Sequence, residues 1–143
     1  MLTRIISAII GIILLGYIIN TGGWVFYASI SLLNVCALYE LRNAFGKKNI
    51  HISFYISSVL AVVLLYFASL NSFDFVVTYL FLILLLMLEF LYNIINSEHN
   101  HLKNMVFSVF SFVYTSFLFM SIILVRNLNI GIKLTWWIFV TTW

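Results

Sequence analysis

Long apolar runs separated by short polar breaks constrain this chain more than any other feature. The first two runs cover residues 2–19 and 24–41 and are separated by the polar break Asn20–Gly23. A helix of about 18 residues reaches about 27 Å, close to the roughly 30 Å hydrocarbon core of a bilayer. Paired glycines allow the positive φ angles that a tight reversal between antiparallel helices requires. The opening residues therefore predict a hairpin of two membrane-spanning helices.

The same unit recurs along the rest of the chain. Further apolar runs cover residues 52–70, 75–95 and 105–125, and a shorter run covers 134–143. The sequence therefore predicts an all-α, polytopic transmembrane protein with five complete spans and a truncated sixth. A run of about ten residues crosses only half a bilayer, so residues 1–143 are interpreted as the N-terminal transmembrane region of a longer membrane protein.

Composition supports a lipid environment and argues against nucleic-acid partners. The chain is 64% hydrophobic and 8% charged, whereas soluble domains average about 25% charged residues. The formal net charge of +3 is small and the basic residues are scattered, so we expect membrane lipids and no nucleic acid among its partners. The single Cys36 has no partner for a disulfide or a thiolate metal site, and it is interpreted as a small packing residue.

Loop charges predict an orientation. If successive runs cross the membrane, one side receives Arg4, Arg42, Lys47, Lys48 and Lys103, and the other receives Arg126 and Lys133. By the positive-inside rule the larger group faces the cytoplasm, which predicts a multi-pass inner (plasma) membrane protein with a cytoplasmic N-terminus. An arginine before an apolar run is also typical of a signal peptide. No small-residue cleavage site closes the run, so we expect the first helix to be retained.

Three residues near the predicted cytoplasmic side are candidates for a substrate path: Glu40, Arg42 and Glu89. An ionisable group in or near hydrocarbon is costly, which makes it a functional candidate by default. Either carboxylate is able to orient a headgroup, hold a divalent cation with other oxygen ligands, or pair with a cation elsewhere in the protein. The structural alternatives are a local ion pair of Glu40 with Arg42 or a loop lysine, and a neutral Glu89 packed against a neighbouring helix. The catalytic residues stay unknown.

The histidines do not predict a metal site. His99 and His101 lie two residues apart, so they point to different faces of a helix and converge only on an extended backbone. His51 lies on the same predicted side, but no cysteine or other close ligand completes a site. We therefore expect a solvated loop and no metal. The sequence also lacks the phosphate-binding loop GxxxxGK[ST] and the motifs HExxH and GxSxG.

Four short motifs carry a family resemblance. They are Leu2-Thr3-Arg4-Ile5, the Gly22-Gly23-Trp24 reversal, the Ala37-Leu38-Tyr39-Glu40-Leu41 end of the second run, and the closing run that begins Leu134-Thr135-Trp136-Trp137. Together they resemble the N-terminal part of the phosphatidate cytidylyltransferase (CDP-diacylglycerol synthase) family. The resemblance implies a nucleotidyltransferase of phospholipid biosynthesis. The full-length enzyme would transfer a cytidylyl group from CTP to phosphatidic acid and release pyrophosphate, with Mg²⁺ as its cofactor.

The resemblance assigns no catalytic residue. The family's diagnostic signature of Lys, Asp and paired Gly residues lies near its C-terminus and does not occur in this sequence. The resemblance implies that the signature follows beyond Trp143, so residues 1–143 alone are expected to be inactive. A homodimer is compatible with the sequence. Two other function classes stay open: a small polytopic transporter or channel subunit in which Glu89 lines a polar path, and another polytopic lipid enzyme, such as an acyltransferase or a polyprenol kinase.

Overall fold

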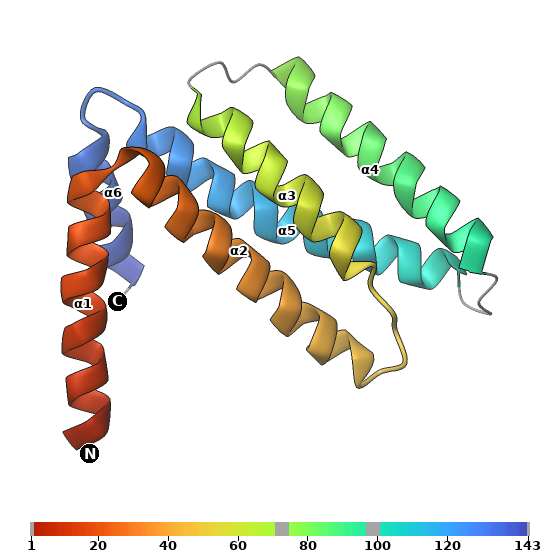
Figure 1. Ribbon diagram of the computed structural model, residues 1–143, viewed down its shortest axis with the longest axis horizontal. Helices are drawn as coiled ribbons and strands as arrows, with labels where there is room; N and C mark the ends of the chain where they lie inside the picture. The colour runs from red at the N-terminus through yellow and green to blue at the C-terminus, as the bar shows by residue number, and fades with distance from the viewer. Residues whose placement is uncertain (1, 71–74, 97–100, 143) are drawn as a thin grey trace.

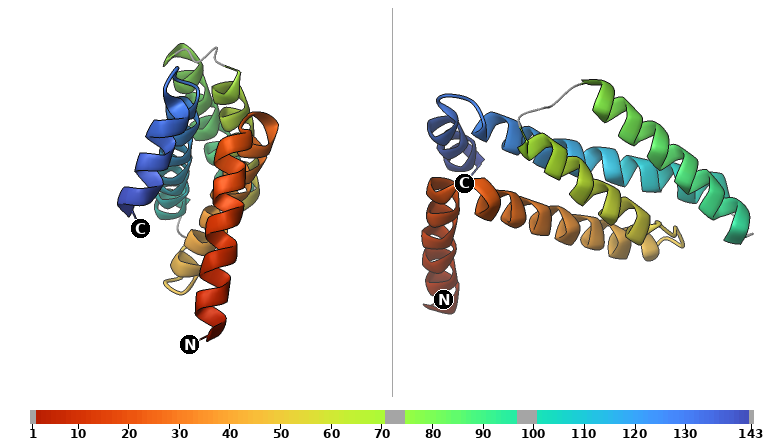
Figure 2. Two further views of the ribbon diagram at one scale, coloured as in Figure 1. Left: turned by 90° about the vertical axis from the view of Figure 1, so that its left-hand side faces the viewer. Right: turned by 45° about the horizontal axis from the view of Figure 1, so that its top comes forward.

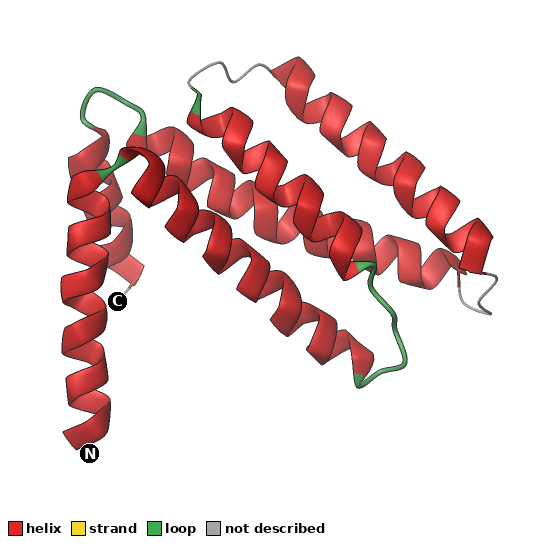
Figure 3. Cartoon of the chain, viewed as in Figure 1, coloured by secondary structure: helices red, strands yellow, loops and turns green. Residues whose placement is uncertain are grey.

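The regular structure of the chain is helical. The computed structural model describes residues 2–70, 75–96 and 101–142, and the regular elements in these ranges are all α-helices. They are α1 (Leu2–Thr21), α2 (Gly23–Gly46), α3 (Phe54–Ser69), α4 (Phe75–Asn96), α5 (His101–Arg126) and α6 (Gly131–Thr142) (Figures 1 and 3). The predicted all-α fold class is confirmed.

Each predicted run contains one helix, but two helices extend well beyond their runs. The run ending at residue 41 continues as helix to Gly46, and the run beginning at residue 105 is preceded by helix from His101. The change from apolar to polar sequence marks the depth at which a helix would meet water, and it does not end the helix. Backbone hydrogen bonds continue through the polar turns.

The last helix, α6, also begins before the predicted sixth run. The run was expected to cover 134–143, whereas α6 begins at Gly131 and is described as far as Thr142. Trp143, with which the predicted run ends, lies outside the described residues. The expectation that the family signature follows beyond Trp143 is therefore not tested by the structure and stays a prediction.

Within the part of the chain that the structure describes, two helices are long and apolar enough to cross a membrane, Gly23–Gly46 and Leu102–Arg126. Three others are apolar but shorter within the described residues: Gly11–Thr21, Phe54–Ser69 and Tyr79–Tyr92. The 16 residues of α3 reach about 24 Å, less than a typical hydrocarbon core. Five complete spans therefore stay a prediction.

The centre of the bundle consists of α2, α3 and α5, which pack against one another. On one side, α4 covers α3 and α5; on the other, α6 packs against α5, and α1 packs against α2 and α6 (Figures 1 and 2). Successive helices reverse direction, so the reversal between α1 and α2 and the C-terminal ends of α3 and α5 lie together. We call this the Arg126 end of the bundle. The opposite end, where α2 ends and α3 and α5 begin, is the Lys47 end.

The outer surface of the bundle is rich in large apolar side chains, and small polar side chains are buried inside it beside an apolar core. One face of α5 exposes large apolar or aromatic side chains at four-residue spacing: Val106, Phe110, Tyr114 and Leu118. The opposite face of the same helix buries Asn104, Ser108, Ser111, Thr115 and Ser116. In hydrocarbon, apolar side chains gain nothing by leaving the lipid, and small or polar residues favour contacts between helices. This arrangement suits a bundle surrounded by lipid.

Two glycines make the predicted reversal between α1 and α2. Gly22 and Gly23 have φ angles of 63° and 52°, in the left-handed region that favours glycine. Arg126, the last residue of α5, donates hydrogen bonds from Nε and Nη2 to the carbonyl oxygen of Ile19, at 3.2 and 3.0 Å. Carbonyls at a helix end lack partners and carry partial negative charge, so Arg126 caps α1. A Cβ on Gly22 would lie 2.7 Å from Nη2 of Arg126.

This contact predicts that Gly22→Ala destabilises the protein more than Gly23→Ala. Both substitutions force an L-residue into a left-handed conformation, at a cost of about 1–2 kcal/mol. A Cβ at Gly23 enters open space, whereas a Cβ at Gly22 must displace the Arg126 guanidinium. Thermal unfolding of the detergent-purified variants measures the difference. Equal losses of stability would show that the Arg126 cap does not require a glycine here.

Candidate functional site

Two of the predicted site residues, Glu40 and Arg42, lie near the C-terminal end of α2 with exposed side chains. The guanidinium carbon of Arg42 lies 5.6 Å from the centroid of the Phe54 ring, a cation–π contact. Tyr39 packs edge-on against the same ring, at 6.0 Å between centroids. Among the described residues Glu40 has no ion-pair partner, so the structural alternative of a local ion pair for Glu40 is not seen there. The Glu40 carboxylate faces solvent or headgroups.

The second candidate carboxylate, Glu89, belongs to α4. Among the described residues, α4 packs against α3 and α5 and makes no contact with α2. The side chain of Glu89 lies outside the described residues, as do Glu98 and His99. The lipid-path role proposed for Glu89 is therefore untested.

Metal-ligating side chains do not cluster in the part of the chain that the structure describes. No three His, Cys, Asp or Glu side chains come together there. His51 is exposed, and its backbone N–H donates to Oδ1 of Asn104 at 3.1 Å. Cys36 is exposed on the outer face of α2, between the exposed Leu32 and Tyr39 one turn away on either side. The interpretation of Cys36 as a packing residue is wrong.

Basic side chains gather at the Lys47 end. Contact between the Phe45 and Phe107 rings, 4.9 Å between centroids, brings the end of α2 beside the start of α5. Exposed cations therefore come from both helices and from the α2–α3 connection: Arg42, Lys47, Lys48 and Lys103. Such a group of cations raises the local concentration of phosphate-bearing lipids and nucleotides. This end of the bundle is suited to attract anionic substrates.

Polar side chains buried between α2, α3 and α5 form what we call the polar seam. Its members are Ser31 and Asn34 on α2, Ser53 on the approach to α3, Ser57 on α3, and Asn104, Ser108, Ser111, Thr115 and Ser116 on α5. Two pairs bond across helices: Nδ2 of Asn34 donates to Oγ of Ser116 at 3.3 Å, and the N–H of Ser53 donates to Oγ of Ser108 at 3.1 Å. The seam lacks acids, bases and activated nucleophiles, so it serves packing.

Sequence reasoning missed the polar seam. The polar positions of α5 recur at intervals of four, three and four residues from Asn104 to Thr115, the period of one helix face. That period in the sequence indicated a polar face on α5.

Three seam atoms have no hydrogen-bond partner, namely Oγ of Ser31, Oδ1 of Asn34 and Oγ of Ser57. An unmade buried hydrogen bond costs about 1–3 kcal/mol, so the seam has unused capacity to bond a polar group or a water molecule.

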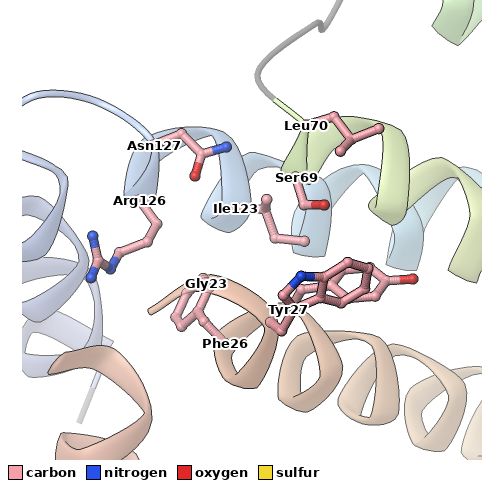
Figure 4. A pocket seen from close by; sticks show the side chains of 9 residues that line it. Gly23, Phe26, Tyr27, Ser69, Leu70, Ile123, Arg126 and Asn127 are labelled. Atoms are coloured by element: carbon pink, nitrogen blue, oxygen red, sulfur yellow. The ribbon is translucent and has the colours of Figure 1, made fainter. Parts of the chain in front are cut away.

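A small pocket lies at the Arg126 end (Figure 4). It has a volume of about 170 Å³ and is lined by the start of α2 and the ends of α3 and α5: Gly23, Trp24, Phe26, Tyr27, Ser69, Leu70, Ile123, Arg126 and Asn127. Figure 4 shows Arg126 extending away from Ser69 and Tyr27, toward α1 and α6. Asn127 donates from Nδ2 to the carbonyl of Ala68 at 3.2 Å, which joins the ends of α3 and α5.

Comparison with known proteins gave one match. A family model described as the cytidylyltransferase family matches residues 2–143, which include all six helices. No curated protein and no solved structure matches the chain.

The polar seam predicts that Ser108→Ala destabilises the bundle more than Ser121→Ala. Ser108 is buried and accepts from the N–H and the hydroxyl of Ser53, both at 3.1 Å. Ser121 is exposed and donates only within its own helix, to the carbonyl of Leu118. The loss at Ser108 should be roughly 1–2 kcal/mol, and the loss at Ser121 within about 0.5 kcal/mol. Unfolding in mixed micelles measures both, and equal stabilities would contradict the role of the seam.

Proposed function

We propose that this chain, which belongs to the cytidylyltransferase family, is the membrane-embedded region of an enzyme that transfers a cytidylyl group from CTP to phosphatidic acid. The observation that carries the proposal is the family match over residues 2–143. Cytidylyl transfer from CTP follows from the family. The choice of phosphatidic acid rests on the motifs of the opening hairpin, including Gly22-Gly23-Trp24.

A membrane location is supported by the two long apolar helices and by the apolar exterior of α5. Within this proposal the protein is a multi-pass protein of the inner membrane, and the Lys47 end faces the cytoplasm. The basic residues at that end favour this orientation under the positive-inside rule. CTP and the phosphate of the lipid would then meet at the end of the bundle that carries most of the described cations. Both substrates are anionic, so these cations would raise their local concentration.

In the proposed reaction, an oxygen of the lipid phosphate attacks the α-phosphorus of CTP. The new P–O bond forms as the bond between the α-phosphorus and the bridging oxygen breaks, and pyrophosphate leaves with the bonding electrons. The products are CDP-diacylglycerol and pyrophosphate. Arg42 and the lysines of the Lys47 end would hold phosphate groups, and Glu40 would orient the lipid headgroup. Negative charge builds up in such a step, so cations near the reacting phosphates favour it.

Among the described residues, no three His, Cys, Asp or Glu side chains cluster to form a site for Mg²⁺. Dependence on Mg²⁺ is therefore proposed from the family resemblance alone, and no step is assigned to the ion here. Two further points stay predictions. One is that residues 1–143 belong to a longer enzyme whose signature lies beyond Trp143, and the other is that the protein forms a homodimer.

The direct test is an assay of membranes from cells that express the intact gene. We expect labelled CTP to be converted to CDP-diacylglycerol only when phosphatidic acid and Mg²⁺ are both supplied, and EDTA to abolish the conversion. Membranes from cells without the gene are the control. Conversion that needs a different acceptor lipid, or no conversion above the control, would contradict the proposal.

Glu40→Gln is expected to lower this activity roughly tenfold or more, since a hydrogen bond to a charged group contributes about 1.5–3 kcal/mol. The exposed Asn43→Ala, three residues further along α2, is the matched control and should keep full activity. Comparison of their unfolding temperatures separates a loss of function from a loss of folding. Unchanged activity of Glu40→Gln would remove Glu40 from the substrate path.

A further inference from the structure

An apolar groove lies beside the pocket at the Arg126 end. The groove has a volume of about 370 Å³ and is lined by α1, α2 and α6: Gly11, Leu14, Leu15, Ile18, Ile19, Phe26, Ser29, Ile30, Leu32, Leu33 and Phe139. Phe26 lines both the pocket and the groove. α1 and α2 diverge from their reversal (Figure 1), and the groove lies along the two diverging helices. The buried ring of Phe26 therefore lies between the pocket and the groove.

The dimensions of the groove suit one acyl chain. Its lining extends from Ile19 to Gly11 along α1 and from Phe26 to Leu33 along α2. Seven or eight residues of helix correspond to roughly 10–12 Å, against about 15 Å for half of a bilayer core. Its floor includes the buried Ile19 and Ile30, whereas the sides include exposed leucines, so the groove is open to surrounding lipid.

Three aromatic rings place the pocket at headgroup depth. Trp24, Tyr27 and Tyr66 are mutually packed, with centroids 5.7 to 5.9 Å apart, and Trp24 and Tyr27 line the pocket. Tryptophan and tyrosine favour the interface between hydrocarbon and water. A molecule whose polar part lies at the level of these rings would therefore extend its apolar part into the bilayer.

The charge at this site favours an anion. Among the nine residues that line the pocket, only Arg126 is charged. The acceptor that the structure gives for its guanidinium is the uncharged carbonyl oxygen of Ile19, and Ile19 also forms the floor of the groove. The guanidinium thus lies at the C-terminal end of α1, the helix that forms one side of the groove.

We propose that the pocket and the groove together bind one anionic phospholipid. Its phosphate lies beside Arg126 at the level of the aromatic rings, and one acyl chain lies in the groove between α1, α2 and α6. The bound lipid fills the space between the diverging helices of the opening hairpin. This proposal rests on the proposed membrane location and is independent of the cytidylyl-transfer reaction.

The test is native mass spectrometry of the purified protein, mixed in detergent with phosphatidylglycerol and phosphatidylcholine of identical acyl chains. Phosphatidylglycerol is not the acceptor in the proposed reaction, so the two proposals fail separately. We expect a several-fold preference for phosphatidylglycerol. Arg126→Gln should remove the preference; because Arg126 also caps α1, its unfolding temperature is measured in parallel.

Gly11→Leu tests the groove without disturbing the cap. A Cβ at Gly11 meets nothing within 4 Å, so the leucine fits and fills the groove. It should lower retention of phosphatidylglycerol several-fold at an unchanged unfolding temperature. Ala28→Leu is the matched control, since Ala28 is exposed on α2 and does not line the groove.

Three results would overturn the proposal. They are equal retention of both lipids by the unmodified protein, full retention by Gly11→Leu, and displacement of the bound lipid by free glycerol phosphate, which would show that the pocket binds the headgroup alone. Failure of the protein to enter the membrane fraction would instead contradict the proposed location.

Discussion

Hydrogen bonds and close contacts of small polar residues between α2, α3 and α5 are the interactions on which the rest of this structure depends. Lipid solvates apolar side chains as well as a protein core does, so burial of apolar surface gives helices in a membrane little reason to associate. Small and polar side chains supply that reason, because they let helices approach closely and bond across the gap. In this bundle they bond from α2 to α5 at Asn34, and from the start of α3 to α5 at Ser53.

The end of α5 connects this central group to the outer helices. Arg126 bonds the last turn of α1, and Asn127 bonds the last turn of α3. A Cβ on Gly131 would collide with the Arg126 carbonyl, so the start of α6 also requires a glycine against α5. In the opening hairpin, Gly22 thus leaves room for the Arg126 cap. The motif Gly22-Gly23-Trp24 lies where the end of α5 contacts the reversal between α1 and α2.

Hydropathy determined which parts of the fold could be predicted from the sequence. It located all six helices, because each apolar run is long enough to require one. It misplaced the C-terminal end of α2 and the N-terminal end of α5, because a change from apolar to polar residues does not end a helix, and α2 and α5 include the polar Asn43 and Lys103. The polar seam escaped notice because serine and threonine are tolerated anywhere in an apolar run. Their helical period on α5 indicated a shared face, and the packing shows that this face contacts α2 and α3. Glu40 and Arg42 lie within the last two turns of α2 and not at the helix end predicted at residue 41. Their spacing did not show that Arg42 would stack on Phe54, since that ring comes from the next helix.

The central claim is that lipid covers the outside of this bundle while small polar side chains line the contacts between α2, α3 and α5, and spin labels on α5 test it most directly. In a Cys36→Ser background, labels at positions 110, 114 and 118 should be accessible to oxygen dissolved in the bilayer and protected from a water-soluble relaxation agent. Labels at 111 and 115, on the seam face, should be protected from both. High accessibility of positions 114 and 118 to the water-soluble agent would contradict the account.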